Sequence, residues 1–309
     1  MEYPIMPEAA RLALLEPPAS KVRFVLDTDT YNEIDDQFAL AYALLSPEKL
    51  ETEAIYAAPF HNNRSSGPGD GMEKSYEEIL RVLDRMGVEA DGLAHRGSTG
   101  YLGGRDEPEQ SDAARDLIER AMRGGGEPLY VAAIGAITNV ASAILIEPRI
   151  IERIVVIWLG GQPQHWSGVQ GEFNLRQDIR AGQVVFDSGV PLVRMPCHGV
   201  TSHLTTTLAE MERYVRGRGP VGDYLYEIFR DYCSHDVATS KVIWDIAAIA
   251  WLIDPDWVPT ELVHSPLLTD QGTWSVDRGR HLIREATFIH RDPVFRDLFT
   301  RLDASGKGE

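Results

Sequence analysis

Short apolar runs alternate with amphipathic segments along almost the whole chain, and this alternation limits the possible fold more than any other feature. The run VRFVLD (22–27), for example, precedes a stretch in which apolar residues recur at helical spacing from Ile34. Strands that alternate with helices build parallel sheets. Further strands are expected within 50–59, 127–135, 154–161 and 190–196, and further helices within 72–87 and 138–150. The sequence therefore predicts an α/β protein with an open, mostly parallel central sheet flanked by helices.

The chain is expected to form one domain over residues 1–309. It shows neither a repeat of fixed period nor a linker long enough to divide it. Residues 1–20 are expected to form an N-terminal arm and residues 303–309 a frayed tail. Two polar, glycine-rich loops at 61–71 and 95–112 are expected at the carboxyl ends of the strands, where open parallel sheets bind their ligands.

The charge balance argues against polyanionic partners. The chain carries 47 acidic and 30 basic residues, a formal net charge of -17, so nucleic acid and anionic membrane surfaces are repelled. Cys197 and Cys233 lack the spacing of a disulfide framework or a zinc site, and neither is expected to be a functional thiol. The N-terminal residues resemble neither a signal peptide nor a membrane span. We therefore expect a cytoplasmic protein.

Four aspartates lie where the first strand meets the following helix. In LDTDTYNEIDD (26–36), Asp27 and Asp29 end the strand while Asp35 and Asp36 occupy the first helical turn. Helix capping explains one or two of them, because Asp stabilises helix starts, but not four. Asp27 and Asp29 are expected to face the same side and to converge on the first helical turn. Such a group suits a hard divalent cation, and calcium tolerates looser geometry than magnesium.

This motif resembles the Asp-rich DxDPGxDD signature of the inosine-uridine type nucleoside hydrolases, with two extra residues inserted. Members of that family are calcium-dependent N-ribohydrolases. Aligned on LDTD, the resemblance makes Asp29 the catalytic base and a metal ligand, and Asp36 a bidentate metal ligand. Alignment on the Asp pair would instead put Tyr31 at the position of the base, which is chemically poor.

Three further motifs resemble the family in the right order. AAIGAITN implies that the backbone carbonyl of Ile134 binds calcium, since any residue type can supply a carbonyl. GEFN implies that Glu172 and Asn174 hold ribose hydroxyls. IWDIAAIAWLI implies that Asp245 is the last protein ligand of calcium, and an unpaired carboxylate in that apolar helix would otherwise be costly to bury.

The resemblance implies hydrolysis of the N-glycosidic bond of a ribonucleoside through an oxocarbenium-like sugar. Asp29 would deprotonate the attacking water, and Asp35 would join Glu172 and Asn174 in binding the sugar hydroxyls. Asn62 or Asn63 would add a further ribose or metal contact. Family members commonly form dimers or tetramers, so a homo-oligomer is expected.

The sequence differs from part of the family at a residue that would assist departure of the base. Pyrimidine-accepting members have a histidine before the C-terminal metal aspartate, whereas this chain has Trp244. An indole cannot donate a proton at neutral pH but can stack on a purine, so purine nucleosides are expected as substrates. His95 or His235 could supply the proton, and Tyr101 and Trp166 could cover the base.

Two other interpretations remain open from the sequence. DTDT also resembles the nucleophile motif of haloacid dehalogenase-type phosphatases, with Asp27 as the nucleophile, Asp29 as the acid and magnesium bound. That interpretation needs a downstream lysine and a carboxylate pair, for which Lys241 and Asp245 are a partial substitute. The other interpretation is a non-catalytic relative that keeps the calcium and ribose site.

Overall fold

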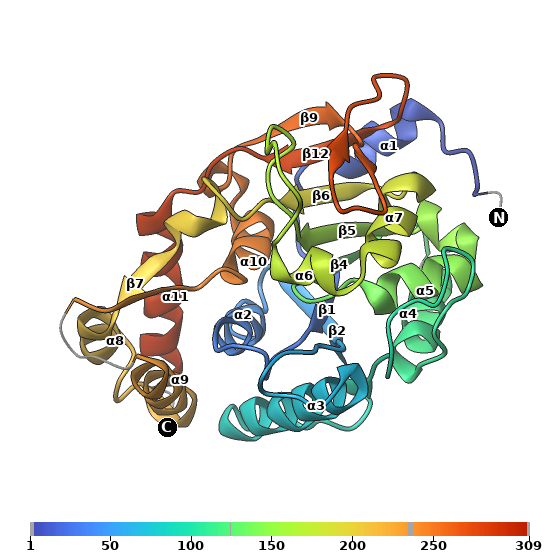
Figure 1. The fold of residues 1–309 in the computed structure, drawn as a ribbon. Coiled ribbons are helices and arrows are strands. Elements are labelled where there is room, and N and C mark those ends of the chain that lie inside the picture. Colours follow the sequence, from blue (N-terminus) through green and yellow to red (C-terminus); the bar gives the residue numbers. More distant parts are fainter. Residues whose placement is uncertain (1–2, 124, 234–237, 308–309) are drawn as a thin grey trace.

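The computed structural model describes residues 3–123, 125–233 and 238–307, and Figure 1 shows a central sheet between helices. The strands are β1 (Val22–Thr28), β2 (Leu50–Ala57), β3 (Ala94–Arg96), β4 (Leu129–Ala133), β5 (Ile154–Leu159), β6 (Leu192–Met195), β7 (Thr205–Thr207), β8 (Ser240–Val242), β9 (Thr260–His264), β10 (Leu267–Leu268), β11 (Trp274–Ser275) and β12 (Leu282–Ala286). The α-helices are α1 (Glu8–Leu15), α2 (Asp35–Leu44), α3 (Pro68–Arg85), α4 (Asp112–Arg123), α5 (Thr138–Ile146), α6 (Phe173–Gln177), α7 (Ile179–Ser188), α8 (Leu208–Tyr214), α9 (Gly219–Tyr232), α10 (Ile246–Ile253) and α11 (Arg291–Ser305). Short 3-10 helices lie at Pro148–Glu152, Thr201–His203 and Pro255–Trp257.

Eight strands form the central sheet in the order β3-β2-β1-β4-β5-β6-β12-β9. All neighbouring strands are parallel except β9, which runs antiparallel to β12 at the edge. The predicted open, mostly parallel sheet flanked by helices is therefore confirmed. The two-stranded sheets β7–β8 and β10–β11 were not predicted, because strands of two or three residues leave no periodic signal in a sequence.

Helices cover both faces of the sheet, which is why its central strands are continuous apolar runs. Strand β5, IVVIWL, is buried along its whole length. Its alternate side chains enter two separate cores, with Ile157 on one face and Trp158 on the other. One core is shared with α2, α3, α9, α10 and α11, and the other with α4, α5 and α7.

The strand order reverses between β1 and β4, since β2 and β3 lie on one side of β1 and β5 and β6 on the other side of β4. In open α/β sheets, ligands bind in the crevice at the carboxyl ends of the strands on either side of such a reversal. The segment 29–34 leaves β1 at this point, and Ile134 follows β4. The fold therefore brings the Asp-rich motif and the AAIGAITN motif to one edge of the sheet.

The two ends of the chain are more ordered than the sequence suggested. The N-terminal arm contains α1, in which Leu15 is fully buried. Helix α11 continues to Ser305, three residues into the stretch expected as a tail, because Leu302 packs in the core. Among the described residues, none of the helices combines the length and apolar composition needed to cross a membrane.

Candidate active site

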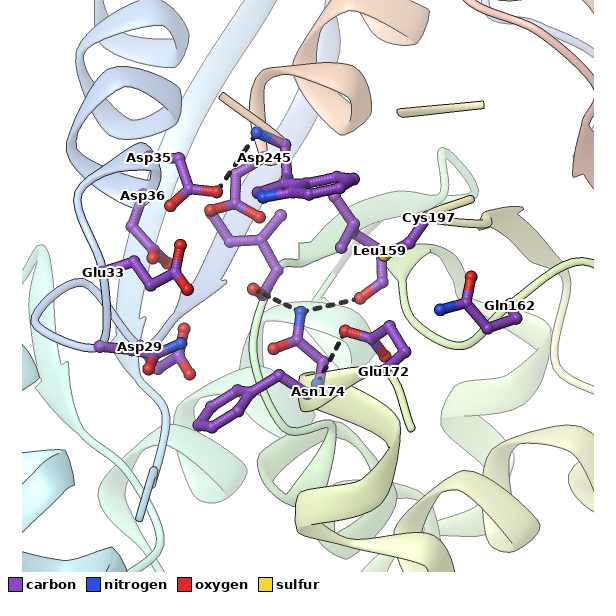
Figure 2. A pocket seen from close by; sticks show the side chains of 14 residues that line it. Asp29, Glu33, Asp35, Asp36, Leu159, Gln162, Glu172, Asn174, Cys197 and Asp245 are labelled. Atoms are coloured by element: carbon purple, nitrogen blue, oxygen red, sulfur yellow. Dashed lines mark hydrogen bonds between the residues drawn. The ribbon is translucent and has the colours of Figure 1, made fainter. Parts of the chain in front are cut away.

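A cavity of about 230 Å³ opens at the strand-order reversal. Carboxylates from the Asp-rich motif form one side in Figure 2, and the start of α6 forms the opposite side. Eight residues predicted for the site line it: Asp29, Asp35, Asp36, Ile134, Glu172, Asn174, Trp244 and Asp245. We call it the first cavity. The structure therefore brings four separate sequence motifs to one site.

Asp29 lies just beyond the end of β1 and is fully buried. Neither oxygen of its carboxylate has a hydrogen-bond donor among the described residues. Buried carboxylate oxygens without a partner are rare, because their desolvation is costly. Both oxygens of Asp29 are thus available to a cation, a water molecule or a substrate in the first cavity.

Three further carboxylates meet beside Asp29. One oxygen from each of Asp35, Asp36 and Asp245 lies within 4.8 Å of the others, and all three residues are buried. Asp35 and Asp36 start α2, while Asp245 immediately precedes α10. The Oγ1 hydroxyl of Thr28 donates to Asp36 at 2.5 Å and orients that carboxylate. The carboxylate cluster therefore depends on the packing of two helices that are distant in sequence.

Asp35 has a different environment from the other two members of this cluster. The backbone N–H of Trp244 donates to its Oδ2 at 3.2 Å, and the Nζ of Lys241 lies 3.7 Å from its Oδ1. Lys241 also forms an ion pair with Glu33. A carboxylate whose charge is partly offset in this way is a weaker cation ligand but still a good acceptor for hydroxyl groups.

Burial and neighbouring negative charge raise the pKa values of Asp29, Asp36 and Asp245. Burial, followed by the charge of Asp35, raises the pKa of Asp36 to about 7. Burial, followed by the charges of Asp36 and Asp35, raises the pKa of Asp29 well above its usual value. Burial, followed by the charges of Asp35 and Asp36, has the same effect on the pKa of Asp245. A divalent cation would relieve this repulsion, so these residues fit a hard cation.

Glu172 and Asn174 form the opposite wall. Glu172 caps α6, and its carboxylate accepts hydrogen bonds from the backbone N–H groups of Gly161, Asn174 and Leu175 at 2.7–2.9 Å. The Nδ2 of Asn174 donates to the carbonyls of Ile134 and Leu159 at 2.9 and 3.0 Å (Figure 2). Both side chains are thereby held in fixed positions on the cavity wall.

Asp27 does not share the orientation of Asp29, contrary to the prediction. The Nδ2 of Asn139, at the start of α5, donates to its Oδ1 at 2.7 Å, and Asp27 does not belong to the cavity lining described above. Strand β1 ends at Thr28, so the alternation of side chains does not extend to residue 29. Burial raises the pKa of Asp27 to about 7, and the hydrogen bond from Asn139 opposes that rise.

The remaining predicted contacts lie elsewhere. His95 packs edge-on against Tyr56, with its Nε2 3.6 Å from Asp116, and does not line the first cavity. Strand β3 pairs with β2 at this position, which directs His95 towards α4 rather than the site. Asn62 reaches the first cavity only indirectly, since its Nδ2 donates to Asn32 Oδ1 at 2.7 Å.

The aromatic side chains expected to cover the base also make contacts outside the first cavity. Tyr101 donates to Gln177, and Trp166 packs against His198 with ring centroids 5.0 Å apart. Neither they nor Asn63 line the first cavity in the part of the chain that the structure describes. His235 falls outside the described residues.

Several lining residues were missed by the sequence analysis: Asn32, Glu33, Leu159, Gln162, Phe173 and Cys197. Asn32 and Glu33 belong to the segment that lengthens the Asp-rich motif, and this insertion was the signal that could have identified them. Burial and the charge of Glu172 raise the pKa of the Cys197 thiol, so it stays neutral at the cavity wall. This agrees with the expectation that it is not a reactive thiol.

The arrangement combines an unpaired buried carboxylate, a second group of carboxylates and fixed acceptors on the facing wall. It can bind a divalent cation together with a polyhydroxylated ligand, and it can accept a proton at Asp29. Among the described lining residues none is a histidine.

Comparison with known proteins gives concordant matches. A pyrimidine-specific ribonucleoside hydrolase, RihA of Salmonella typhimurium, is 29% identical over 251 residues, which cover 72% of this chain and 77% of the relative. A plant nucleoside hydrolase, PpNRh1, superposes with a TM-score of 0.76 at 20% identity, covering 93% of this chain and all of that chain. A purine-preferring ribonucleoside hydrolase from Gardnerella vaginalis gives a TM-score of 0.73 at 20% identity, with the same coverage. These structural matches show the same fold.

The family model for the inosine-uridine preferring nucleoside hydrolases matches residues 24–297. This match spans β1 to α11 and includes every element that contributes to the first cavity. It sets aside the phosphatase interpretation of DTDT, in agreement with the position of Asp27 beneath the site. The chain belongs to the inosine-uridine preferring nucleoside hydrolase family.

Proposed function

We propose that this protein hydrolyses the N-glycosidic bond of purine ribonucleosides to the free base and ribose, with calcium as its cofactor. The observation that carries the proposal is the buried Asp29 carboxylate, whose two unpaired oxygens face a cavity that also contains three clustered carboxylates. Family membership supports the reaction class.

Calcium would be held by Asp29, Asp36, Asp245 and the backbone carbonyl of Ile134. The first three are buried carboxylates with raised pKa values, and Ile134 lines the same cavity. A bound calcium ion supplies Lewis acidity, which lowers the pKa of a coordinated water molecule.

The protein side chains position the sugar and take the proton. Asp29 accepts the proton of the attacking water, because its oxygens have no competing donor among the described residues. Asp35 and the Oδ1 of Asn174 accept hydrogen bonds from the sugar hydroxyls, since the Nδ2 of Asn174 already donates to two carbonyls. The two side chains lie on opposite walls of the first cavity (Figure 2). Glu172 binds the sugar with the lone pairs that remain after capping α6.

The preference for purines rests on Trp244, which lines the first cavity beside Asp245. An indole offers a large stacking face to a bicyclic base but no proton for a pyrimidine. The name of the RihA relatives points the other way, to pyrimidine substrates. We assign the preference from the residue in this cavity, and the rates for inosine and uridine decide between the two.

The test is release of free ribose from inosine and uridine, with added calcium or with a chelator. We expect calcium-dependent release, faster from inosine, and a loss of at least about 10³-fold in Asp29→Ala, within the range for a lost general base. Asp27→Asn is the matched control, because it is nearly isosteric and outside the cavity lining, and it should retain most of the activity.

Two other results of this assay would contradict the proposal. Ribose release that is equal in Asp29→Ala and wild type would refute the role of Asp29. Binding of calcium and nucleoside without any ribose release would show the non-catalytic relative. The expected oligomer and cytoplasmic location stay predictions.

A further inference from the structure

A larger cavity of about 600 Å³ adjoins the first one. The two share Asn32 and Glu33, so the inserted part of the Asp-rich motif forms the boundary between them. We call it the second cavity; it is lined by Tyr31, Asn32, Glu33, Ile34, Gln37, Asn62, Asn63, Arg64, Glu78, Arg81, Tyr224, Ile228, Asp231 and Tyr232. The first cavity, at about 230 Å³, lies below the roughly 300–1,000 Å³ that is typical of ligand pockets, whereas the second lies within that range.

The charged residues of the second cavity are paired with one exception. Glu78 pairs with Arg81 and also accepts hydrogen bonds from Gln37 and Tyr224. Glu33 pairs with Lys241, and Asp231 pairs with Arg230.

Arg64 is the exception: it forms no ion pair with any carboxylate within residues 3–123, 125–233 and 238–307. Arg64 is therefore the charged residue of this wall that no carboxylate pairs with in the part of the chain that the structure describes.

Arg64 is held in a fixed position on this wall. Its Nη1 donates to the backbone carbonyls of Glu33 and Asn32 at 3.1 and 3.4 Å, and its guanidinium stacks on Tyr31, 4.2 Å from the ring centroid. Its backbone is also tied down, because the N–H donates to Asn62 Oδ1 at 2.8 Å and the carbonyl accepts from Lys74 at 2.8 Å. A guanidinium has five N–H donors, so most of those on Arg64 stay available to a ligand.

We propose that the second cavity binds an anionic group carried by the ribosyl ligand whose sugar occupies the first cavity, and that Arg64 recognises this group. The inference rests on the proposed function and specifies its substrate class. A fixed guanidinium without a carboxylate partner is suited to bidentate hydrogen bonding with a carboxylate, a phosphate or an ionised base.

The surrounding charges give such a ligand one orientation. Asp29, Asp35, Asp36 and Asp245 repel an anion from the first cavity, and the net charge of -17 repels it from the rest of the surface. The neutral sugar therefore faces the carboxylates and the anionic group faces Arg64. The group can belong to an ionised edge of the base or to the 5′ position of the sugar.

Three compounds with closely related purines separate these possibilities. Inosine is neutral, xanthosine carries an ionised base near pH 8, and inosine 5′-monophosphate carries its charge on the sugar. We would measure Kd for each on Asp29→Asn to prevent turnover, and kcat/KM for each on the wild-type protein. Compared with inosine, at least one anionic compound should have a Kd about tenfold or more lower and a kcat/KM about tenfold or more higher. If xanthosine is the compound that binds more tightly, the recognised anionic group belongs to the base. If inosine 5′-monophosphate is that compound, the group belongs to the sugar.

The Arg64 variants test the residue itself. Arg64→Gln should reduce the advantage of the anionic compound over inosine by about tenfold, while Arg64→Lys should keep part of it. The readout is the ratio of the Kd for inosine to the Kd for the anionic compound. Loss of the hydrogen bonds to residues 32 and 33 would affect the Kd of all three compounds alike and would leave this ratio unchanged. Arg96→Gln is the matched control, because Arg96 also stacks on a tyrosine, Tyr76, but lies outside both cavities.

The proposal is overturned if neither anionic compound binds better than inosine, or if Arg64→Gln leaves the ratio of Kd values unchanged. Its failure is distinct from failure of the proposed function. Ribose release from inosine and uridine tests the reaction without any anionic group, and the Kd ratios test Arg64 without any turnover.

Discussion

Two buried carboxylates in the first cavity, Asp29 and Glu172, have opposite surroundings. Glu172 accepts three backbone N–H groups, whereas neither oxygen of Asp29 has a donor among the described residues. Burial raises the pKa of both, but hydrogen bonds from the backbone of Gly161, Leu175 and Asn174 counteract the rise at Glu172. The amides stabilise the ionised form of Glu172, so it is suited to positioning, while Asp29 is suited to accepting a proton.

The choice of base is predicted to depend on Trp244. Replacing it by histidine adds a group that can protonate a departing pyrimidine, at the cost of the indole stacking surface. Trp244→His should therefore raise kcat/KM for uridine relative to inosine by about tenfold or more, a cautious value for general acid catalysis. Steady-state kinetics on both nucleosides would check this ratio. Trp244→Phe is the control, since it keeps an aromatic ring without a proton donor, and a ratio that rises equally in both variants would contradict the role of the imidazole.

At the level of secondary-structure elements, one side chain holds together the strands beneath the site. Asn139 lies in the first turn of α5 and donates from Nδ2 to Asp27 on β1 and to the carbonyl of Ala57 on β2. Its Oδ1 accepts from the backbone N–H and the hydroxyl of Ser98, which follows β3. All of these groups are buried, so the network fixes the carboxyl ends of the strands from which the Asp-rich motif leaves.

Asn139→Ala is expected to lower the free energy of unfolding by about 1–3 kcal/mol per buried polar group left without a partner, and Asp27 is the first such group. Urea denaturation followed by circular dichroism would measure the change. Asn63→Ala, at an exposed position, is the control and should be nearly neutral. If the two variants were equally stable, the network would not support the strand ends as the geometry indicates.

The sequence predicted elements and local motifs better than contacts between distant segments. The apolar runs of β1, β4 and β5 and the position of Asp29 follow from local patterns. The ion pair between Glu33 and Lys241 joins residues 208 positions apart, and no local pattern indicates it. His95 was misplaced for a similar reason, because strand pairing decides which side of the sheet edge it occupies.

At the scale of the whole molecule, the site concentrates the negative charge that dominates the chain. Five acidic residues line the first cavity on the side of the Asp-rich motif and α10: Asp29, Glu33, Asp35, Asp36 and Asp245. The net charge of -17 adds to their repulsion. In the absence of a cation, the fold accommodates these carboxylates by keeping protons on some of them, as the raised pKa values of Asp29, Asp36 and Asp245 indicate.

Stability should therefore depend on pH and calcium together. Because the pKa of Asp36 in the folded protein, about 7, lies above its ordinary value of 3.8, the folded state holds a proton that the unfolded chain has already released between about pH 4 and 7. The contribution of this group to the free energy of unfolding consequently falls as the pH rises through that window. Calcium replaces the proton and should restore the loss, so its stabilising effect grows with pH.

Thermal unfolding at pH 5 and pH 8, each with calcium or with a chelator, would measure this coupling. At pH 8 calcium should raise Tm by at least about 5 °C when its concentration is far above Kd, and at pH 5 by less than half of that, because protons compete for the same oxygens. Asp36→Asn removes one of these carboxylates with little change of shape, so it should reduce the calcium effect at pH 8. A calcium effect that is equal at the two pH values would mean that the cation binds away from the buried carboxylates, since only groups that titrate in this range couple calcium to protons.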